Sequence, residues 1–402
     1  MSRNWSALPC LLFLVLELSK GADSNRFKLK RVVILSRHNV RAPLTDNLEK
    51  VTPYAWPEWS ASTSHLTPNG VILEEFMGEY FGEWLKREEL FPTDCPKESV
   101  NIYSNSRQRT KESAKAFARG AFKNCDVNVN YKYEDDRMDF TFDPIIHNTT
   151  VEFADIVVNI MKKKYKEFDL KYAYMILSEI LNMKDSDMCK DDAICSFDDY
   201  ESKFFYESGK EPNLLGGLHA ANAIVDSFMM AYYDGMPPKN VAWGKINKSS
   251  QWKNLMDINK HNHNIRFNST IIAKDVGYPL LDYLKNAFLN DVTKLIVLMG
   301  HDVNIYSVLA ALNFQPYELV EQYEKTPVGG KLVFQKWYDV QDKIDLLKVD
   351  YVYQTTEQLR NKVKLSLESP PKWVAMEMDG CEVDSRGFCL WTDFVSLLKK
   401  FK

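Results

Sequence analysis

The chain has no excess of positive charge. Its 51 lysines and arginines are outnumbered by 55 aspartates and glutamates, which gives a formal net charge of −4 at pH 7. Proteins that bind nucleic acid usually carry clustered positive charge, so this balance argues against a nucleic-acid partner. The one basic run, Lys162–Lys166, is better explained as the solvated face of a helix.

Long hydrophobic runs are also scarce. Ala7–Leu18 follows Arg3 and precedes the small residues Ser19 and Gly21, a pattern typical of an export signal that is cleaved near Gly21. This stretch is shorter than the about 20 residues that a membrane-spanning helix needs, and no other segment could span. We therefore expect residues 1–21 to be a signal peptide, with no membrane anchor and a secreted or periplasmic location.

Two common catalytic motifs are missing. The sequence contains neither a Walker-type glycine loop nor a Gly-x-Ser-x-Gly elbow, which makes a nucleotide-dependent kinase and a serine hydrolase poor interpretations. Internal repeats and low-complexity tracts are absent as well. With 402 residues, 45% of them hydrophobic and 13% aromatic, the chain is long enough for a large core and two domains.

One apolar run ends in a histidine between two arginines. Arg31–Leu35 predicts a strand, and Ser36–Pro43 follows it with Arg37, His38 and Arg41. Open α/β sheets bind ligands at the C-terminal ends of their strands, and the arginine fork suits phosphate. Neighbouring cations should also disfavour protonation of His38 and leave a ring nitrogen free to attack phosphorus. Taken alone, the motif could equally be an ordinary basic loop.

Two further predicted strands end in residues of matching chemistry. Lys294–Met299 precedes His301 and Asp302, and this carboxylate could serve as a proton donor. Val100–Ser104 precedes Arg109, which adds positive charge to the start of a predicted helix. Each segment also has an ordinary explanation. Gly300–Asp302 could be a loop in which this combination occurs by chance, and Arg109 could be a solvated surface charge. Three such strand ends in one chain are much less expected by chance.

These stretches resemble the histidine acid phosphatase family, whose pattern is Arg-His-Gly-x-Arg-x-Pro followed far downstream by His-Asp. Ser36–Pro43 and Gly300–Asp302 match this pattern. Asn39 and Arg41–Leu44 are most similar to the glucose-1-phosphatase branch, which is related to the phytases. Further matching segments are Thr52–Trp59, Thr326–Trp337 and Tyr351–Gln354. The resemblance covers about residues 30–395.

The resemblance implies a role for each residue of the motif. His38 would attack phosphorus and form a phosphohistidine, and Asp302 would protonate the leaving oxygen and later help to activate water. The phosphate would be bound by Arg37, Arg41, Arg109 and His301. No metal or other cofactor is implied, because the guanidinium groups supply the positive charge. The expected partner is a small-molecule phosphomonoester.

Substrate preference is predicted from the loop after Pro43. Phytase relatives carry a lysine shortly after that proline, whereas Leu44–Asn47 offers no cation and one anion. Like-charge repulsion should therefore disfavour a multiply phosphorylated substrate. We expect a sugar phosphate, with glucose 1-phosphate first, and a phytase or a broad-specificity acid phosphatase as the alternative. A phosphotransferase or mutase of the wider superfamily, or a non-catalytic secreted protein, are the other interpretations left open.

Cysteine usage agrees with export. Loss of Cys10 with the signal leaves six cysteines, and an even number in an exported chain indicates disulfides, although six cysteines allow 15 pairings. The resembling family favours the sequential pairs Cys95–Cys125, Cys189–Cys195 and Cys381–Cys389. Candidate glycosylation sites occur at Asn148, Asn247 and Asn268.

The order of predicted elements indicates an α/β fold. Thr67 and Pro68 begin a predicted helix whose apolar residues continue at helical spacing to Trp84. From about residue 141 to residue 290 the hydrophobic pattern predicts mostly helices. Strand patterns return from residue 291, as in Lys331–Trp337. We expect a central, mainly parallel sheet flanked by helices, with an inserted smaller helical domain and the site in the cleft between. The predicted domains are residues 22–140 and 291–402 for the α/β domain and residues 141–290 for the helical insertion.

Two other histidines, His261 and His263, flank Asn262. A metal site is one interpretation of this pair. Because no cysteine or carboxylate ligands stand at matching spacing, a polar loop is the better interpretation.

Overall fold

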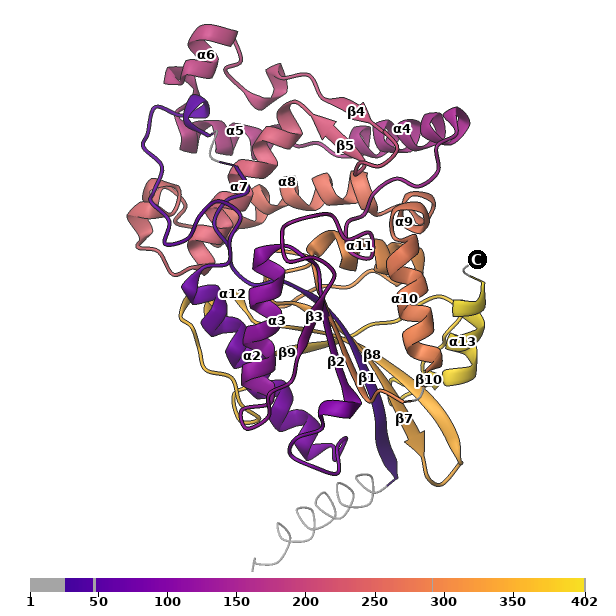
Figure 1. Cartoon of the computed structure of the whole chain (residues 1–402). Coiled ribbons are helices and arrows are strands. Elements are labelled where there is room, and N and C mark those ends of the chain that lie inside the picture. The colour runs from indigo at the N-terminus through magenta and orange to yellow at the C-terminus, as the bar shows by residue number, and fades with distance from the viewer. Residues whose placement is uncertain (1–25, 46–47, 291, 401–402) are drawn as a thin grey trace, which may run out of the picture.

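The computed structural model describes residues 26–45, 48–290 and 292–400 of the chain. The expected signal peptide, residues 1–21, lies outside these ranges. Within them, eight strands form one mixed sheet in the order β10-β8-β7-β1-β6-β2-β3, with β9 paired to β8 (Figure 1). The strands are β1 (Phe27–Arg37), β2 (Val100–Ser104), β3 (Val129–Tyr131), β6 (Leu295–Gly300), β7 (Lys331–Asp339), β8 (Ile344–Tyr353), β9 (Lys372–Ala375) and β10 (Cys389–Leu390).

β1 lies in the middle of this sheet. It pairs in parallel with β6 and antiparallel with β7, and β6, β2 and β3 continue the parallel half. The run Val32–Leu35 is fully buried because its alternate side chains enter two different hydrophobic cores, one on each face. This explains why the strand is continuously apolar. The α/β fold class is thus confirmed, and the antiparallel half of the sheet is built on the β7–β8 hairpin.

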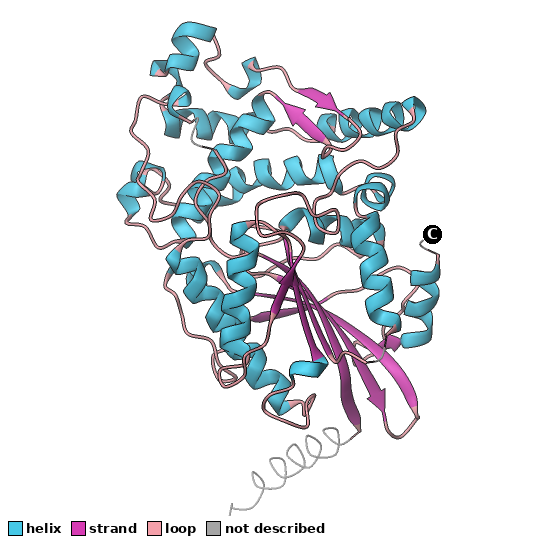
Figure 2. Ribbon diagram, viewed as in Figure 1, coloured by secondary structure: helices cyan, strands magenta, loops and turns pink. Residues whose placement is uncertain are grey.

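Helices cover both faces of the sheet (Figure 2). One face is covered by α2 (Pro68–Arg87) and α3 (Gln108–Ala121). The other face is covered by α9 (Thr270–Val276), α10 (Tyr278–Leu289), α11 (Asp302–Ala311) and α13 (Trp391–Lys399). None of the helices in the described ranges combines the length and the apolar character needed to cross a membrane.

The predicted helix after Thr67 is confirmed as α2. The Thr67 hydroxyl caps it by accepting a hydrogen bond from the Gly70 N–H at 2.9 Å, and Pro68 occupies the first turn. α2 and α3 approach each other closely through Gly78 and Gly120. A Cβ atom at Gly78 would lie 2.3 Å from the carbonyl oxygen of Phe117, so the close contact requires glycine.

A helical layer stands above the C-terminal ends of the central strands (Figure 1). It consists of α4 (Val151–Lys166), α5 (Lys171–Leu181), α6 (Asp187–Asp192), α7 (Gly217–Tyr233), α8 (Ser249–Phe267) and the hairpin of β4 (Lys203–Phe205) and β5 (Asn213–Leu215). A third large core fills this layer, whereas α10 packs on the sheet. The predicted domain boundaries at residues 140 and 290 stay predictions.

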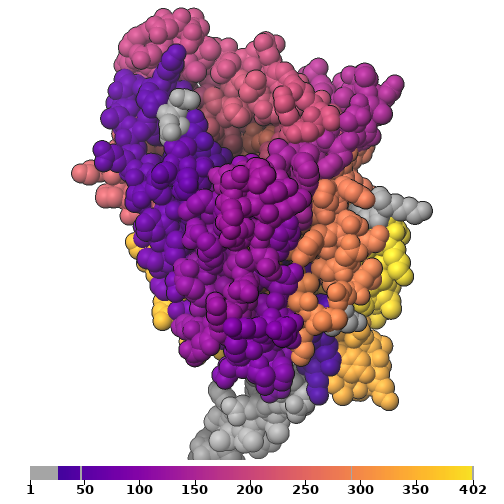
Figure 3. Space-filling view, in the orientation of Figure 1, coloured from indigo at the N-terminus to yellow at the C-terminus, as the bar shows by residue number. Residues whose placement is uncertain are grey.

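The segment after β1 climbs along the side of the helical layer, where it is coloured indigo in Figure 3. The Thr52 hydroxyl donates to the carbonyl oxygen of Leu181 at 2.7 Å, and Lys245 donates to the Tyr54 hydroxyl at 2.9 Å. These bonds join the segment that follows β1 to the helices above it.

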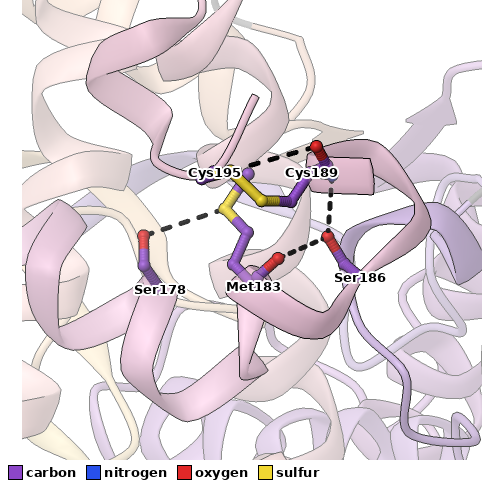
Figure 4. The surroundings of a disulfide bond; sticks show 5 residues. All are labelled: Ser178, Met183, Ser186, Cys189 and Cys195. Carbon is purple, nitrogen blue, oxygen red and sulfur yellow. Dashed lines mark hydrogen bonds between the residues drawn. A yellow bond between two sulfur atoms is a disulfide. The ribbon is translucent and has the colours of Figure 1, made fainter. Parts of the chain in front are cut away.

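Three disulfides join the pairs that the family resemblance implies: Cys95–Cys125, Cys189–Cys195 and Cys381–Cys389. The second disulfide joins Cys189 in the short helix α6 to Cys195 just after that helix, and Ser186 caps the first turn of α6 (Figure 4). Of the three candidate glycosylation sites, Asn247 and Asn268 are exposed and Asn148 is half-buried. Their use remains a prediction.

A fully buried ion pair connects α2 to the sheet. Lys331 of β7 donates to Glu74 of α2 at 2.6 Å and to the Ser36 hydroxyl at 2.8 Å, and neither charged side chain is exposed. The other oxygen of Glu74 accepts a hydrogen bond from the Asn39 side chain at 2.9 Å. Asn39, which stands where most of the resembling family has glycine, therefore anchors the backbone that follows His38.

Glu74→Gln should lower the free energy of unfolding by about 3 kcal/mol, because it leaves the buried Lys331 ammonium without its counter-charge. Urea denaturation of the purified proteins measures this. The matched control is Asp94→Asn, which removes an exposed pair with Lys86 and should change the free energy by less than about 0.5 kcal/mol. Equal effects of the two substitutions would contradict the buried-pair argument.

Candidate active site

The strand register brings the predicted site residues to one edge of the sheet. Arg37 pairs with Gly300 and Ser104 pairs with Met299, so β1, β6 and β2 end side by side. The backbone N–H of His38 donates to the carbonyl oxygen of Gly300 at 2.9 Å. His38 and His301, each directly after its strand, therefore face one another with ring centroids 5.4 Å apart.

The His38 ring is held in one tautomer. Its Nδ1 lies 2.7 Å from the carbonyl oxygen of Asn39. A carbonyl oxygen can only accept a hydrogen bond, so Nδ1 carries the proton and Nε2 keeps its lone pair. His38 as a whole is 3% exposed. The arrangement therefore presents one free nitrogen of a buried imidazole to the site.

The surroundings of His38 disfavour its charged form. Burial lowers the pKa of His38 well below its usual value, and the positive charges of Arg109, Arg37 and Arg41 lower it further. Burial and Arg109 lower the pKa of His301 in the same way. A neutral His38 is the form that can act as a nucleophile.

The guanidinium group of Arg37 is held in place by three neighbouring groups. Its Nη1 donates to Glu324 at 2.8 Å and to the carbonyl oxygen of Thr326 at 2.7 Å, while its Nη2 lies 3.2 Å from Asp302. Glu324 and the other carboxylates raise the pKa of the Arg37 guanidinium despite its burial. The charge is thus permanent and its orientation is set before any ligand binds.

Arg41 and Arg109 complete the positive cluster in different ways. Both terminal nitrogens of Arg41 donate to Asp226 of α7, at 3.0 and 3.1 Å. Arg109 stands in the first turn of α3, and its buried Nε has no hydrogen-bond partner among the described residues. Burial and the charges of Arg41 and Arg107 lower the pKa of Arg109 to about 10. Uncompensated buried charge of this kind favours binding of an anion.

Asp302 is the first residue of α11 and belongs to the same cluster. Its Oδ2 lies near Arg37 and 3.4 Å from Nε2 of His263, and its Oδ1 accepts the backbone N–H of Val303 at 2.8 Å. Burial raises the pKa of Asp302, but the Arg37 and His263 charges outweigh it and hold the pKa well below its usual range. In the ligand-free site Asp302 is therefore a carboxylate.

The structure gathers all six predicted residues of the motif: Arg37, His38, Arg41, Arg109, His301 and Asp302. Their individual roles stay predictions. In the loop after Pro43, Leu44 is exposed, while Asp46 and Asn47 lie outside the described residues. In the residues that the structure describes, no group of three or more histidine, cysteine or acidic side chains is placed to hold a metal ion.

Sequence reasoning missed three neighbours of the cluster. The polar loop expected at His261 and His263 is wrong, because both lie in α8. The apolar spacing of Trp252, Leu255 and Met256 was the available signal for this helix. The other two missed residues are the carboxylates Asp226 and Glu324, which come from distant segments and carry no local signal.

Comparison with known proteins supports one family. A sequence model of the histidine phosphatase superfamily (branch 2) matches residues 28–227. Glucose-1-phosphatase of Providencia rettgeri is 43% identical over 92% of this chain and 91% of its own length. Glucose-1-phosphatase of Salmonella typhimurium is 41% identical over 90% of each chain. The solved structure of the Hafnia alvei phytase superposes with a TM-score of 0.86, at 29% identity, over 94% of this chain and 97% of that one.

The neutral state of buried His38 should appear in the pH dependence of stability. Below its ordinary pKa of about 6.5 the unfolded chain binds a proton at His38 and the folded protein does not, so stability falls as the pH falls. Between pH 6 and 5 the free energy of unfolding of the wild type should drop about 1 kcal/mol more than that of His38→Gln. Urea denaturation across this range, with exposed His147→Gln as control, measures it. Parallel curves for wild type and His38→Gln would contradict the assignment.

Proposed function

The chain belongs to the histidine phosphatase superfamily (branch 2), and from this premise we propose that it hydrolyses sugar phosphates through a phosphohistidine on His38. It is a phosphoric monoester hydrolase. The observation that carries the proposal is the free Nε2 of a neutral, buried His38 inside a cluster of three guanidinium groups.

In the first step the phosphate of the substrate binds to the positive cluster. The groups proposed to hold it are Arg37, Arg41, Arg109 and His301. The transition state spreads negative charge over the equatorial oxygens of phosphorus, and charges already fixed in place stabilise it without reorganisation. His38 Nε2 then forms a bond to phosphorus as the bond to the leaving oxygen breaks, and Asp302 gives that oxygen a proton.

In the second step water hydrolyses the phosphohistidine. Asp302, now a carboxylate again, accepts a proton from the attacking water, and the N–P bond breaks to release inorganic phosphate. His38 returns to its starting form. Because Asp302 is ionised in the ligand-free site, binding of the dianionic phosphate beside it must favour its protonation before the first step.

The preferred substrate is a phosphomonoester of low charge, with glucose 1-phosphate as the leading candidate. Two observations support this choice. The two bacterial glucose-1-phosphatases match nearly the whole chain. Asp226 also places a carboxylate against Arg41 at the site, which disfavours further phosphate groups nearby. A phytase or a broad-specificity acid phosphatase is the alternative, supported by the likeness to the Hafnia alvei phytase.

We also propose that the enzyme works outside the cytoplasm. Three disulfides in one chain are typical of an oxidising compartment. An export signal at residues 1–21 remains the matching prediction.

His38→Ala should abolish turnover, because the attacking nitrogen is lost. Wild-type enzyme quenched during turnover of ³²P-labelled glucose 1-phosphate should carry an acid-labile, base-stable label on one histidine, and the variant should carry none. A labelled His38→Ala protein, or wild-type turnover without any label, would contradict the covalent mechanism.

Glucose 1-phosphate should give a higher kcat/KM than phytate at acidic pH, since the carboxylate of Asp226 repels additional phosphates. Release of inorganic phosphate from each substrate measures this. Asp226→Asn should raise the phytate to glucose 1-phosphate ratio several-fold by removing one negative charge. A clear wild-type preference for phytate would reverse the substrate assignment.

A further inference from the structure

A second histidine stands behind Asp302. His263 lies on α8, its side chain is 8% exposed, and its Nε2 is 3.4 Å from Oδ2 of Asp302. Its ring stacks on Tyr306 of α11, with centroids 4.9 Å apart and planes inclined by 11°. α8 and α11 are in contact, with α8 above α11 in Figure 1. Neither side chain can turn away from the other without losing this stack.

The other nitrogen of the ring fixes what Nε2 can do. Nδ1 of His263 lies 2.9 Å from the carbonyl oxygen of Asn259, one helical turn earlier. A carbonyl oxygen only accepts, so Nδ1 is the donor. A neutral His263 then keeps its lone pair on Nε2, 3.4 Å from Oδ2 of Asp302. A proton shared between Nε2 and Oδ2 would relieve the repulsion between the lone pairs of these two atoms.

The surrounding charges bear on where that proton resides. Nη2 of Arg37 lies 3.2 Å from Oδ2 of Asp302 and favours the carboxylate form of Asp302 while the site is empty. Other titratable or charged groups also surround the pair: His38, His301, Arg109, Glu324, Tyr306 and Tyr351. On the α8 side Asn259 is held by the amide of Asn222 and brings no charge.

We propose that His263 is a positioning residue that stores the proton which Asp302 delivers to the leaving group. This inference rests on the proposed function and deepens it. Phosphate binding brings negative charge to Asp302, and the proton moves from Nε2 of His263 to Oδ2 of Asp302. Asp302 thereby becomes the acid that its pairing with Arg37 otherwise prevents.

The proton balance closes over one turnover. When phosphorus bonds to His38, the proton on Oδ2 passes to the leaving oxygen and Asp302 becomes a carboxylate beside neutral His263. When water attacks the phosphohistidine, its proton passes to Asp302. Release of phosphate removes the negative charge, and the proton returns to Nε2 of His263. No other reactant is consumed.

The test uses two variants of His263 and one matched control. His263→Gln keeps a hydrogen-bond donor toward Asp302, and His263→Phe keeps the stack on Tyr306, but neither can exchange a proton. His261→Gln is the control, since His261 lies on the same helix and stacks on Phe168. Rapid-quench single turnovers measure the rate of phosphoenzyme formation on glucose 1-phosphate and on p-nitrophenyl phosphate between pH 4 and 8.

Both His263 variants should form phosphoenzyme about tenfold more slowly from glucose 1-phosphate at pH 6, because its leaving oxygen needs a proton. Their alkaline limb on this substrate should move to lower pH by about one unit. The rate on p-nitrophenyl phosphate, a good leaving group, should stay within twofold of wild type, and His261→Gln should match wild type on both. Asp302→Asn should share the dependence on the leaving group.

Unchanged rates and pH limbs in the His263 variants would overturn the inference. Equal losses of rate on both substrates would also overturn it, and so would wild-type rates in His263→Phe, since either result indicates that His263 acts by packing alone. The proposed function fails separately, if wild-type enzyme forms no phosphoenzyme from either substrate.

Discussion

The structure depends on the burial of positive charge at the ends of β1, β6 and β2. Arg37, His38 and Arg41 are each at most 3% exposed. A buried ion loses several kcal/mol of hydration free energy unless counter-charges and hydrogen bonds replace the water. Here Glu324, Asp302 and Asp226 supply those counter-charges. The loop before β7, the start of α11 and the middle of α7 must therefore meet at one place.

This requirement explains why the helical layer and the sheet form one site. The sheet contributes the cations, while α7 contributes the carboxylate on Arg41 and α8 contributes the histidine behind Asp302. Arg109 differs from Arg37 and Arg41, because its guanidinium forms no ion pair with a carboxylate in the described part of the chain. The charge of Arg109 is therefore left for an incoming anion such as a phosphate.

The sequence alone predicted the α/β class, α2 with its Thr67 cap and the residues of the motif. Each of these features is encoded in one short segment of the sequence. For the motif, a strand pattern is followed directly by the polar side chains of the site. The positions of Asp226, Glu324 and His263 could not be predicted in this way. Their function arises from packing between segments far apart in the chain. On α8, Asn259, Asn262 and His263 make the buried face look polar, so the helix resembles a loop.

The position of β1 in the sheet has a consequence for how the protein is made. Its two neighbours, β6 and β7, are separated from it by more than two hundred and fifty residues. A chain emerging from the ribosome cannot complete its central strand until residue 339 has been synthesised. Such long-range pairing slows folding and leaves apolar strands exposed meanwhile. Most of the nascent polypeptide therefore has to be shielded from aggregation before His38 can reach its native place.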